Sequence, residues 1–188
     1  GGAAAIAAAE AGASVLILEK MPDPGGISIT SGGGLRVTDD AAAAFDYIRH
    51  SNDGRTPDAN ILPIAEGMVW LKDWFSDLAA HCGARVDVAP RAGNYPFPGF
   101  DRLGMLEVTA IPGFDPAKAY PHARTLRGGT RAGKGGEAPR ATGGGAGVFH
   151  IVEANVQRLG VDVALGAPVL RLLHESGAVT GALAQVNG

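Results

Sequence analysis

The first 18 residues show a helix followed by a buried strand. Residues 1–12 are almost entirely glycine and alanine, and Gly12 ends this run. Alanine is the strongest helix former and glycine is common just after a helix, so the pattern predicts a helix here. The apolar run Ser14–Leu18 is short and almost unbroken, which is typical of a strand buried on both faces of a parallel sheet. A helix that leads directly into such a strand indicates an α/β fold.

Two more helices are predicted in the middle of the chain. Asp39 or Asp40 is a suitable N-cap for a helix through Ala41–His50. A longer helix is expected at about residues 59–82, where apolar residues recur at helical spacing. The members of this apolar stripe are Ile64, Met68, Leu71, Phe75 and Leu78. A short strand, Ala84–Val88, is predicted to follow it.

Regular patterns return after an irregular segment. Residues 90–147 are rich in proline and glycine, and only Leu106–Ile111 has the pattern of a strand there. A glycine-led helix is then predicted to run to Arg158. The remaining elements are a strand at Val161–Leu165 and a hairpin of Val169–His174 and Ala178–Val186.

Composition narrows the class of protein. The 188 residues are 46% hydrophobic and carry a formal net charge of −3, which is ordinary for one soluble domain and gives no footprint of nucleic-acid binding. No apolar run reaches the roughly 18 residues of a membrane span. Glycine, with 29 residues, has about twice its usual share, which points to turns that approach a ligand or to flexible loops. The single cysteine, Cys82, excludes an internal disulfide and favours a reducing, cytoplasmic location.

Glu19 and Lys20 follow the first strand, where dinucleotide-binding folds carry an acidic residue. In such folds a glycine turn opens a helix that holds the pyrophosphate, and an acid about 20 residues further on binds the adenosine ribose. Here Gly1 would be the last glycine of that turn and Glu19 the acid. The alternative is an alanine-rich helix packed on a strand with a solvated end. Because the strand before Gly1 is absent, this half of the fingerprint leaves both interpretations open.

A second glycine-rich tract strengthens the nucleotide-binding interpretation. Gly25 and Gly26 end a turn that contains two prolines, and a second cluster follows at Gly32–Gly34. Glycines let a backbone approach a ligand closely, and hydroxyl side chains between them supply hydrogen-bond donors. The tract therefore indicates a backbone that runs along a ligand.

The stretch AAAIAAAEAGASVLILEK, followed by GG and SITSGGG, resembles the flavoprotein superfamily of fumarate reductase and succinate dehydrogenase. Within it, the branch of 3-ketosteroid dehydrogenases and related FAD-binding dehydrogenases is most similar. The resemblance implies FAD as cofactor and an α/β, three-layer, Rossmann-like FAD-binding fold with a β-meander, whose first strand is missing here. It also implies that the following residues lie along FAD: Gly1, Glu19, Lys20, Gly25, Gly26, Ser28, Thr30, Ser31, Gly32 and Gly33, with the backbone of Val169 at the adenine ring. Ile27 stands where the family often has Asn, Ser or Thr, which removes the basis for a side-chain hydrogen bond there but not for backbone contacts.

The same resemblance implies a function for the whole protein. It would oxidise or reduce a carbon–carbon bond beside a carbonyl or carboxylate, on a small molecule such as a steroid-like ketone or a carboxylic acid. Residues 1–188 would be an incomplete FAD-binding domain, truncated at both ends, without the substrate-capping domain and inactive alone. One rival is an α/β fragment that binds no flavin. Another is an NAD(P)-binding domain, against which the second glycine tract argues, because nicotinamide domains usually lack one.

Few other residues suggest chemistry, and the catalytic residues stay unassigned. The five histidines show no metal-ligand spacing, so no metal is expected. Tyr95, Tyr120 and His122 are candidates for acid–base work or substrate binding, with structural roles as the alternative. A basic loop follows, which would receive an anionic substrate or stay solvated, and its basic residues are Arg124, Arg127, Arg131, Lys134 and Arg140. Residues 128–134 match the spacing of a P-loop, but neither a Ser or Thr nor a preceding strand accompanies them, which excludes that site.

Overall fold

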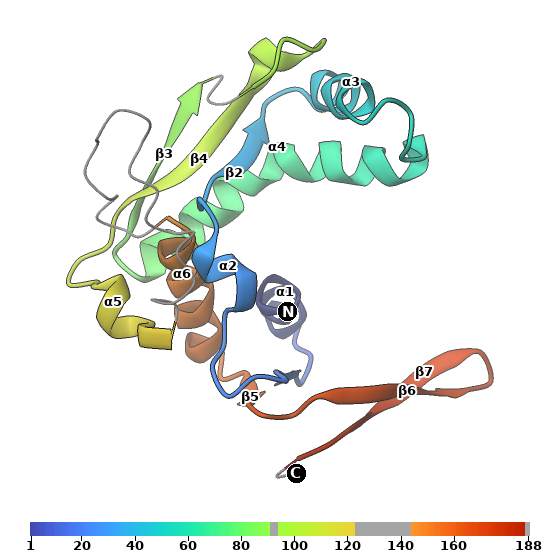
Figure 1. Ribbon diagram of the computed structural model, residues 1–188, viewed down its shortest axis with the longest axis vertical. Coiled ribbons are helices and arrows are strands. Elements are labelled where there is room, and N and C mark those ends of the chain that lie inside the picture. Colours follow the sequence, from blue (N-terminus) through green and yellow to red (C-terminus); the bar gives the residue numbers. More distant parts are fainter. Residues whose placement is uncertain (91–93, 123–143, 187–188) are drawn as a thin grey trace.

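The computed structural model describes residues 1–90, 94–122 and 144–186. Helices and strands are interspersed along the chain, so the predicted α/β class is confirmed (Figure 1). The described strands fall into three separate sheets: a parallel pair, a three-stranded antiparallel sheet and a hairpin. The basic loop predicted at residues 122–140 lies, apart from His122, outside the described residues.

The parallel pair joins a strand near the N-terminus to a strand that precedes the C-terminal hairpin. Strand β1 (Leu16–Leu18) pairs with β5 (Asp162–Ala164), so that Leu16 faces Asp162 and Leu18 faces Ala164. Helix α1 (Gly2–Glu10) packs against both β1 and helix α6 (Gly145–Arg158). The predicted helices at these positions are confirmed, and both strands are confirmed in shorter form. The pairing is parallel, but the prediction that Ser14–Leu18 is buried on both faces is wrong, because Leu16 is 59% exposed in this two-stranded sheet.

The antiparallel sheet is built from the middle of the chain. Strand β4 (Leu103–Ala110) lies between β2 (Leu35–Thr38) and β3 (Arg85–Pro90). The long helix α4 (Asp58–His81) packs against β2 and β3, and α3 (Ala41–Ser51) packs against α4. This sheet and its helices form the upper half of the molecule in Figure 1.

Several short elements were not predicted from the pattern of hydrophobic residues. They are β2, the helix α2 (Gly26–Thr30), the 3₁₀ turn η1 (Phe100–Arg102) and the helix α5 (Pro116–Ala119). Each is five residues or fewer, which is too short for a helical or strand periodicity to show. Helix α2 forms because tertiary contacts hold it: Ile29 is buried and α2 packs against α6. At the start of α3, the N-cap is Asp40, one of the two predicted candidates, and its carboxylate accepts a hydrogen bond from the amide of Ala43 at 3.0 Å.

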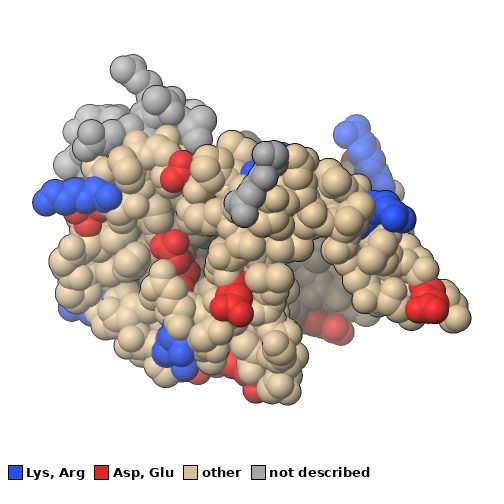
Figure 2. All heavy atoms as spheres, turned by 90° about the horizontal axis from the view of Figure 1, so that it is seen from below, with Lys and Arg blue, Asp and Glu red and all other residues tan. Residues whose placement is uncertain are grey.

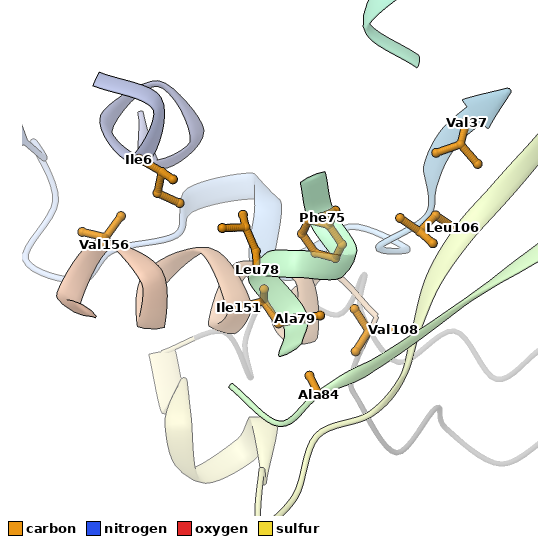
Figure 3. Close-up of a cluster of buried hydrophobic side chains, with 10 residues drawn as sticks. All are labelled: Ile6, Val37, Phe75, Leu78, Ala79, Ala84, Leu106, Val108, Ile151 and Val156. Carbon is orange, nitrogen blue, oxygen red and sulfur yellow. The ribbon is translucent and has the colours of Figure 1, made fainter. Parts of the chain in front are cut away.

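One continuous hydrophobic core connects the two halves. Figure 3 shows Ile6 of α1 and Val156 of α6 at one end of the buried cluster, and Leu106 of β4 at the other end. Phe75 and Leu78 of α4 lie between them. Helix α4 therefore bridges the parallel pair and the antiparallel sheet, and burial of Phe75 and Leu78 holds the two parts together. Ile64, which was predicted to belong to the same apolar stripe, is instead 55% exposed.

Asn155 is the one buried polar side chain within the described core, and it joins α4 to α6. Its amide nitrogen donates to the carbonyl of Leu78 at 3.0 Å and to that of Ile151 at 2.8 Å. Its oxygen accepts from Arg158 Nε at 3.0 Å. The carbonyls in the last turn of a helix lack partners within that helix, so Asn155 supplies one for Leu78 at the end of α4.

Strands β6 (Val169–Glu175) and β7 (Ala178–Ala184) form a hairpin that extends away from the rest of the described chain (Figure 1). The predicted hairpin is thus confirmed, and its two-residue turn has positive φ at both Ser176 and Gly177, as hairpin turns of the primed types require. Apolar side chains on both of its faces are exposed, including Leu170 and Val179.

The surface outside the hairpin is mixed in character. Figure 2 shows one face of the molecule, on which acidic and basic side chains are scattered among uncharged residues. Among the helices that the structure describes, none is both long and apolar enough to cross a membrane. Within the same residues, no three side chains of His, Cys, Asp or Glu come together as metal ligands would.

Candidate functional site

A cavity of about 540 Å³ lies where the N-terminus of α1, the C-terminal ends of β1 and β5, and one face of α6 meet. The turn at Pro24–Ser28 forms a further wall. The lining residues are Gly1, Gly2, Ile17, Glu19, Pro24, Gly25, Gly26, Ile27, Ser28, Phe149, Val152, Glu153, Val156, Gln157, Val163 and Leu165. Ligand pockets in proteins have volumes of roughly 300–1,000 Å³, so this cavity is large enough to receive a substantial part of a nucleotide cofactor.

Helix α1 begins in the wall of this cavity. Gly1 is its N-cap residue, and the Gly1 carbonyl accepts the first helical hydrogen bond, from Ala5, at 3.0 Å. The amides of a first helical turn point out of the helix, and the helix dipole places partial positive charge there. A Cβ added to Gly2 would lie 2.4 Å from Cγ1 of Val152, so the glycine lets α1 approach α6 closely. The helix start is therefore both open to an anion and fixed in position.

Glu19 lies at the C-terminal end of β1, in a loop that hydrogen bonds tie to β5. The Glu19 amide donates to the carbonyl of Ala164 at 2.9 Å, and the Glu19 carbonyl accepts from Ala167 at 2.8 Å. The Glu19 carboxylate accepts from the amide of Met21 at 2.8 Å, which orients this half-buried side chain at the cavity wall. These bonds also bring the chain that leads to Val169 next to Glu19.

Gly25 and Gly26 form a left-handed turn that leads from the cavity into α2. Their φ angles are +105° and +46°, which side chains rarely tolerate. A Cβ on Gly25 would lie 2.0 Å from Cδ1 of Ile29, whereas a Cβ on Gly26 would meet no protein atom within 4 Å. Gly26 therefore presents bare backbone with open space beside it, which is the property that close approach to a ligand requires.

The second glycine cluster packs against another part of the protein. A Cβ on Gly33, whose φ is +73°, would lie 2.3 Å from the carbonyl carbon of Gly144. A Cβ on Gly145 would lie 2.0 Å from the carbonyl oxygen of Ser28. The amide of Gly145 donates to the Ser31 carbonyl at 2.9 Å, and the Ser31 hydroxyl donates to the Ser28 carbonyl at 2.9 Å. Contacts within the protein thus explain why residue 33 is a glycine and why residue 31 carries a hydroxyl group. Contact of Gly33 and Ser31 with FAD stays a prediction.

Tyr120 is buried beside the cavity wall and contacts a residue that lines it. Its hydroxyl donates to Oε2 of Glu153 at 2.7 Å. Burial raises the pKa of the Tyr120 phenol well above its ordinary value, and the neighbouring Glu153 carboxylate raises it further. A phenol so placed stays protonated and serves as a hydrogen-bond donor, not as a general base.

Five of the predicted site residues line the cavity together: Gly1, Glu19, Gly25, Gly26 and Ser28. The other predicted residues do not line it. Lys20 is exposed directly after Glu19, and Val169 is half exposed at the start of β6. Thr30, Ser31, Gly32 and Gly33 lie at the end of α2 and in the loop that follows it.

Sequence reasoning missed the α6 face of the cavity. Phe149, Val152, Glu153, Val156 and Gln157 all line it. Their spacing alternates between three residues and one residue, which places them on one side of a helix. That stripe was visible in the sequence, but nothing local indicated that it borders a cavity as well as the core, to which Val156 also belongs.

The remaining candidates for chemistry lie apart from the cavity lining. The Tyr95 side chain is 70% exposed, and the Tyr95 amide donates to the hydroxyl of Tyr47 on α3. His122 contacts Pro24 and Asp23 through its ring nitrogens. No catalytic residue is therefore assigned.

A helix start, a carboxylate at a strand end and an open glycine turn converge on one cavity, and this arrangement defines a nucleotide-binding α/β domain. These features fit a dinucleotide. The start of α1 suits a phosphate, the Glu19 carboxylate suits ribose hydroxyls, and the glycine turn leaves room for the ligand. The chain belongs to the FAD binding domain family, which matches residues 1–188. FAD is therefore the cofactor of this domain, and the predicted FAD-binding domain is confirmed.

Solved structures share the fold. One is a 3-ketosteroid-Δ4-(5α)-dehydrogenase from Rhodococcus jostii RHA1 in complex with 4-androstene-3,17-dione, with a TM-score of 0.69, 19% identity and coverage of 100% of this chain and 40% of that chain. Another is a 3-ketosteroid Δ1-dehydrogenase from Sterolibacterium denitrificans in complex with 1,4-androstadiene-3,17-dione, with a TM-score of 0.67, 19% identity and coverage of 100% and 43%. The chain thus spans less than half the length of these proteins. No curated protein matches it.

Proposed function

We propose that this chain is the FAD-holding part of a flavin-dependent oxidoreductase that acts on a carbon–carbon bond beside a carbonyl or carboxylate. The observation that carries the proposal is the cavity in which Gly1, Glu19 and the Gly25–Gly26 turn converge. The two solved relatives are named as dehydrogenases of ketosteroids and hold steroid ketones. Their names support a steroid-like ketone as substrate, and a small carboxylic acid is the second candidate.

Each predicted residue has a distinct task in this proposal. The start of α1 at Gly1 faces the pyrophosphate, and Glu19 accepts hydrogen bonds from the ribose, with Lys20 beside it. The backbone and hydroxyl groups of the second tract follow the rest of FAD, and the backbone of Val169 meets the adenine. The members of that tract are Gly25, Gly26, Ser28, Thr30, Ser31, Gly32 and Gly33.

Bound FAD supplies hydride chemistry, and the protein supplies position and electrostatics. Apolar side chains in the cavity wall, Ile17, Phe149 and Leu165, exclude water from the part of the ligand that they cover. We assign residues 1–188 to one incomplete FAD-binding domain, and we place the residues that bind and protonate the substrate in a capping domain outside it. Residues 1–188 alone are then expected to bind FAD but not to turn over substrate.

The location of the protein is a further part of the proposal. The single cysteine, Cys82, is half buried and free, which suits a reducing compartment such as the cytoplasm. Partners of other classes are not proposed, since neither a strong basic field nor a long apolar helix is found in the described part of the chain.

The test is FAD binding by the 188-residue chain, followed through the visible spectrum of the flavin at increasing protein concentration. Glu19→Gln is expected to weaken FAD binding by about tenfold to a hundredfold, because it removes a charge-assisted hydrogen bond of roughly 1.5–3 kcal/mol. The matched control is Glu175→Gln, on the exposed end of β6, which should leave the affinity unchanged.

The outcomes separate the proposal from its rival. If circular dichroism shows a folded chain that leaves the flavin spectrum unchanged, the fragment without flavin is the correct interpretation. If both glutamate variants bind FAD as the parent does, Glu19 has no place in the site.

A further inference from the structure

Tyr120 and His122 do not line the cavity, but each contacts a residue that does. Tyr120 contacts Glu153, and His122 contacts Pro24. Tyr120 and His122 lie directly after α5, where the amide of Tyr120 donates to the carbonyl of Pro116 at 3.0 Å. The Asp115 carboxylate caps α5 by accepting from the amides of Ala117 and Lys118. The start of this segment is therefore fixed by its own local structure.

The first wall is the α6 face. Tyr120 is 4% exposed, and its hydroxyl donates to Oε2 of Glu153 at 2.7 Å. The Tyr120 ring packs in a small buried cluster with Ile29 and Ala146, and lies 5.5 Å from the ring of Phe149. Glu153 and Phe149 both line the cavity, so Tyr120 fixes the position of one polar and one aromatic side chain in its wall.

The second wall is the glycine turn. Nε2 of His122 lies 3.3 Å from the carbonyl oxygen of Pro24, and Nδ1 lies 3.8 Å from Oδ1 of Asp23. Both contacts are made directly before Gly25, where the chain turns into the left-handed conformation. The ring of His122 also lies edge-on to that of Tyr120, at 6.2 Å between centroids. One short segment thus connects both walls.

The glycine turn needs such support. Glycine loses more conformational freedom on ordering than any other residue. A flexible turn lowers the affinity for a ligand, because the entropy lost when the turn becomes ordered reduces the free energy of binding. Helix α2, which follows the turn, is only five residues long and adds little stability of its own. Contacts with Tyr120 and His122 would order the turn before a ligand arrives.

We propose that Tyr120 and His122 are positioning residues of the FAD cavity, which hold Glu153 and the Pro24–Gly25 turn in the geometry that receives FAD. The proposal rests on the proposed function for its cofactor, but the ordering of the turn is a property of the chain itself. The two parts are therefore tested separately.

The first test is amide hydrogen exchange in the 188-residue chain without FAD. The amide of Ser28, which donates to the Gly25 carbonyl at 3.0 Å, reports on the turn. Tyr120→Phe and His122→Ala are each expected to speed its exchange by about tenfold, the effect of losing one typical hydrogen bond. Exchange at Leu78 in the core of α4 should not change. The controls are Tyr95→Phe and His174→Ala, whose side chains are exposed elsewhere.

Unchanged Ser28 exchange in both variants would overturn the proposal whether or not FAD binds. Equal acceleration at Ser28 and Leu78 would also overturn it, because that result shows a general loss of stability.

The second test is FAD affinity in the same variants. Tyr120→Phe and His122→Ala should each raise the Kd for FAD several-fold. His122→Gln, which keeps a donor for the Pro24 carbonyl, should retain most of the parent affinity for FAD. If the parent chain and the Glu19 variant fail to bind FAD, the proposed function fails while the exchange data still decide the ordering role. If the turn exchanges faster but the Kd for FAD is unchanged, the positioning role toward FAD is wrong.

Discussion

Gly33 lies at a point where the backbones of two distant segments touch. Its added Cβ would lie 2.3 Å from the carbonyl carbon of Gly144, an atom that cannot rotate away as a side chain would. Its φ of +73° would also strain any L side chain. Both effects act on the folded state, so the cost of a substitution there should be large.

We expect Gly33→Ala to lower the free energy of unfolding by about 2–4 kcal/mol, since it combines overpacking with backbone strain. Gly32→Ala is the matched control, because a Cβ at Gly32 meets no atom within 4 Å and its φ is not positive. Its effect should stay within about 0.5 kcal/mol. Urea denaturation of both variants measures this difference, and equal stabilities would contradict the close contact of Gly33 with Gly144.

At the scale of elements, the junction of α4 and α6 depends on a polar side chain inside an apolar interface. Asn155 is fully buried, and its amide is a hydrogen-bond partner of the Leu78 carbonyl in the last turn of α4. Burying a carbonyl without a partner costs more than the bond itself contributes.

Asn155→Leu, which keeps the branching of the side chain but replaces the amide with bulkier methyl groups, should therefore destabilise the chain by about 1–3 kcal/mol. Asn60→Leu, on the exposed side of α4, is the control and should change the stability by less than about 0.5 kcal/mol. Thermal unfolding followed by circular dichroism compares the two. A stable Asn155→Leu variant would show that the Cys82 thiol, whose Sγ lies 3.5 Å from the Leu78 carbonyl oxygen, satisfies that carbonyl alone.

Elements with a long periodic pattern could be predicted from the sequence, and short ones could not. Helix α4 was expected at residues 59–82 and is found at Asp58–His81, because Met68, Phe75 and Leu78 recur at helical spacing and are buried. The four residues of β2 carry too little pattern, and they become a strand only because β4 lies beside them. The residues of α2 are poor helix formers, and packing against α6 overrides their propensity.

The candidate site divides in the same way. Gly1, Glu19 and the Gly25–Gly26 turn could be predicted, because a dinucleotide site uses local sequence signals near the start of the fold. The α6 wall could not, because its residues reach the cavity through tertiary packing. The sequence presents Tyr120 as a candidate for acid–base work or substrate binding, with a structural role as the alternative. Its burial against Glu153 depends on a fold that no local pattern reveals.

At the scale of the whole molecule, two groups with raised pKa values, the Tyr120 phenol and the Cys82 thiol, make the free energy of unfolding depend on pH. Burial raises the pKa of the Tyr120 phenol above its ordinary value of 10.0, and burial raises that of the Cys82 thiol above 9.0. In each case the unfolded chain loses its proton at a lower pH than the folded chain does. The stabilising contribution is therefore complete below the ordinary pKa and decreases as the pH rises above it.

The free energy of unfolding should consequently fall above pH 10, by about 1.4 kcal/mol per pH unit for the Tyr120 proton. In Tyr120→Phe this part of the slope should disappear, while Cys82→Ala removes the part that begins near pH 9. Urea denaturation between pH 8 and pH 11 measures both slopes. A parent chain whose stability is flat over this range would contradict the burial of the Tyr120 hydroxyl.

The pairing of β1 with β5 has a consequence for the order of events in folding. Leu16 meets Asp162, so the parallel pair closes a loop that contains most of the chain, and closing such a loop early carries a high entropic cost. Contacts within the middle of the chain, such as those of β3 with β4, are nearer in sequence and can form first. On a ribosome, the cofactor cavity would then be completed only after α6 and β5 have emerged, so FAD would bind only once the chain up to Leu165 is available to fold.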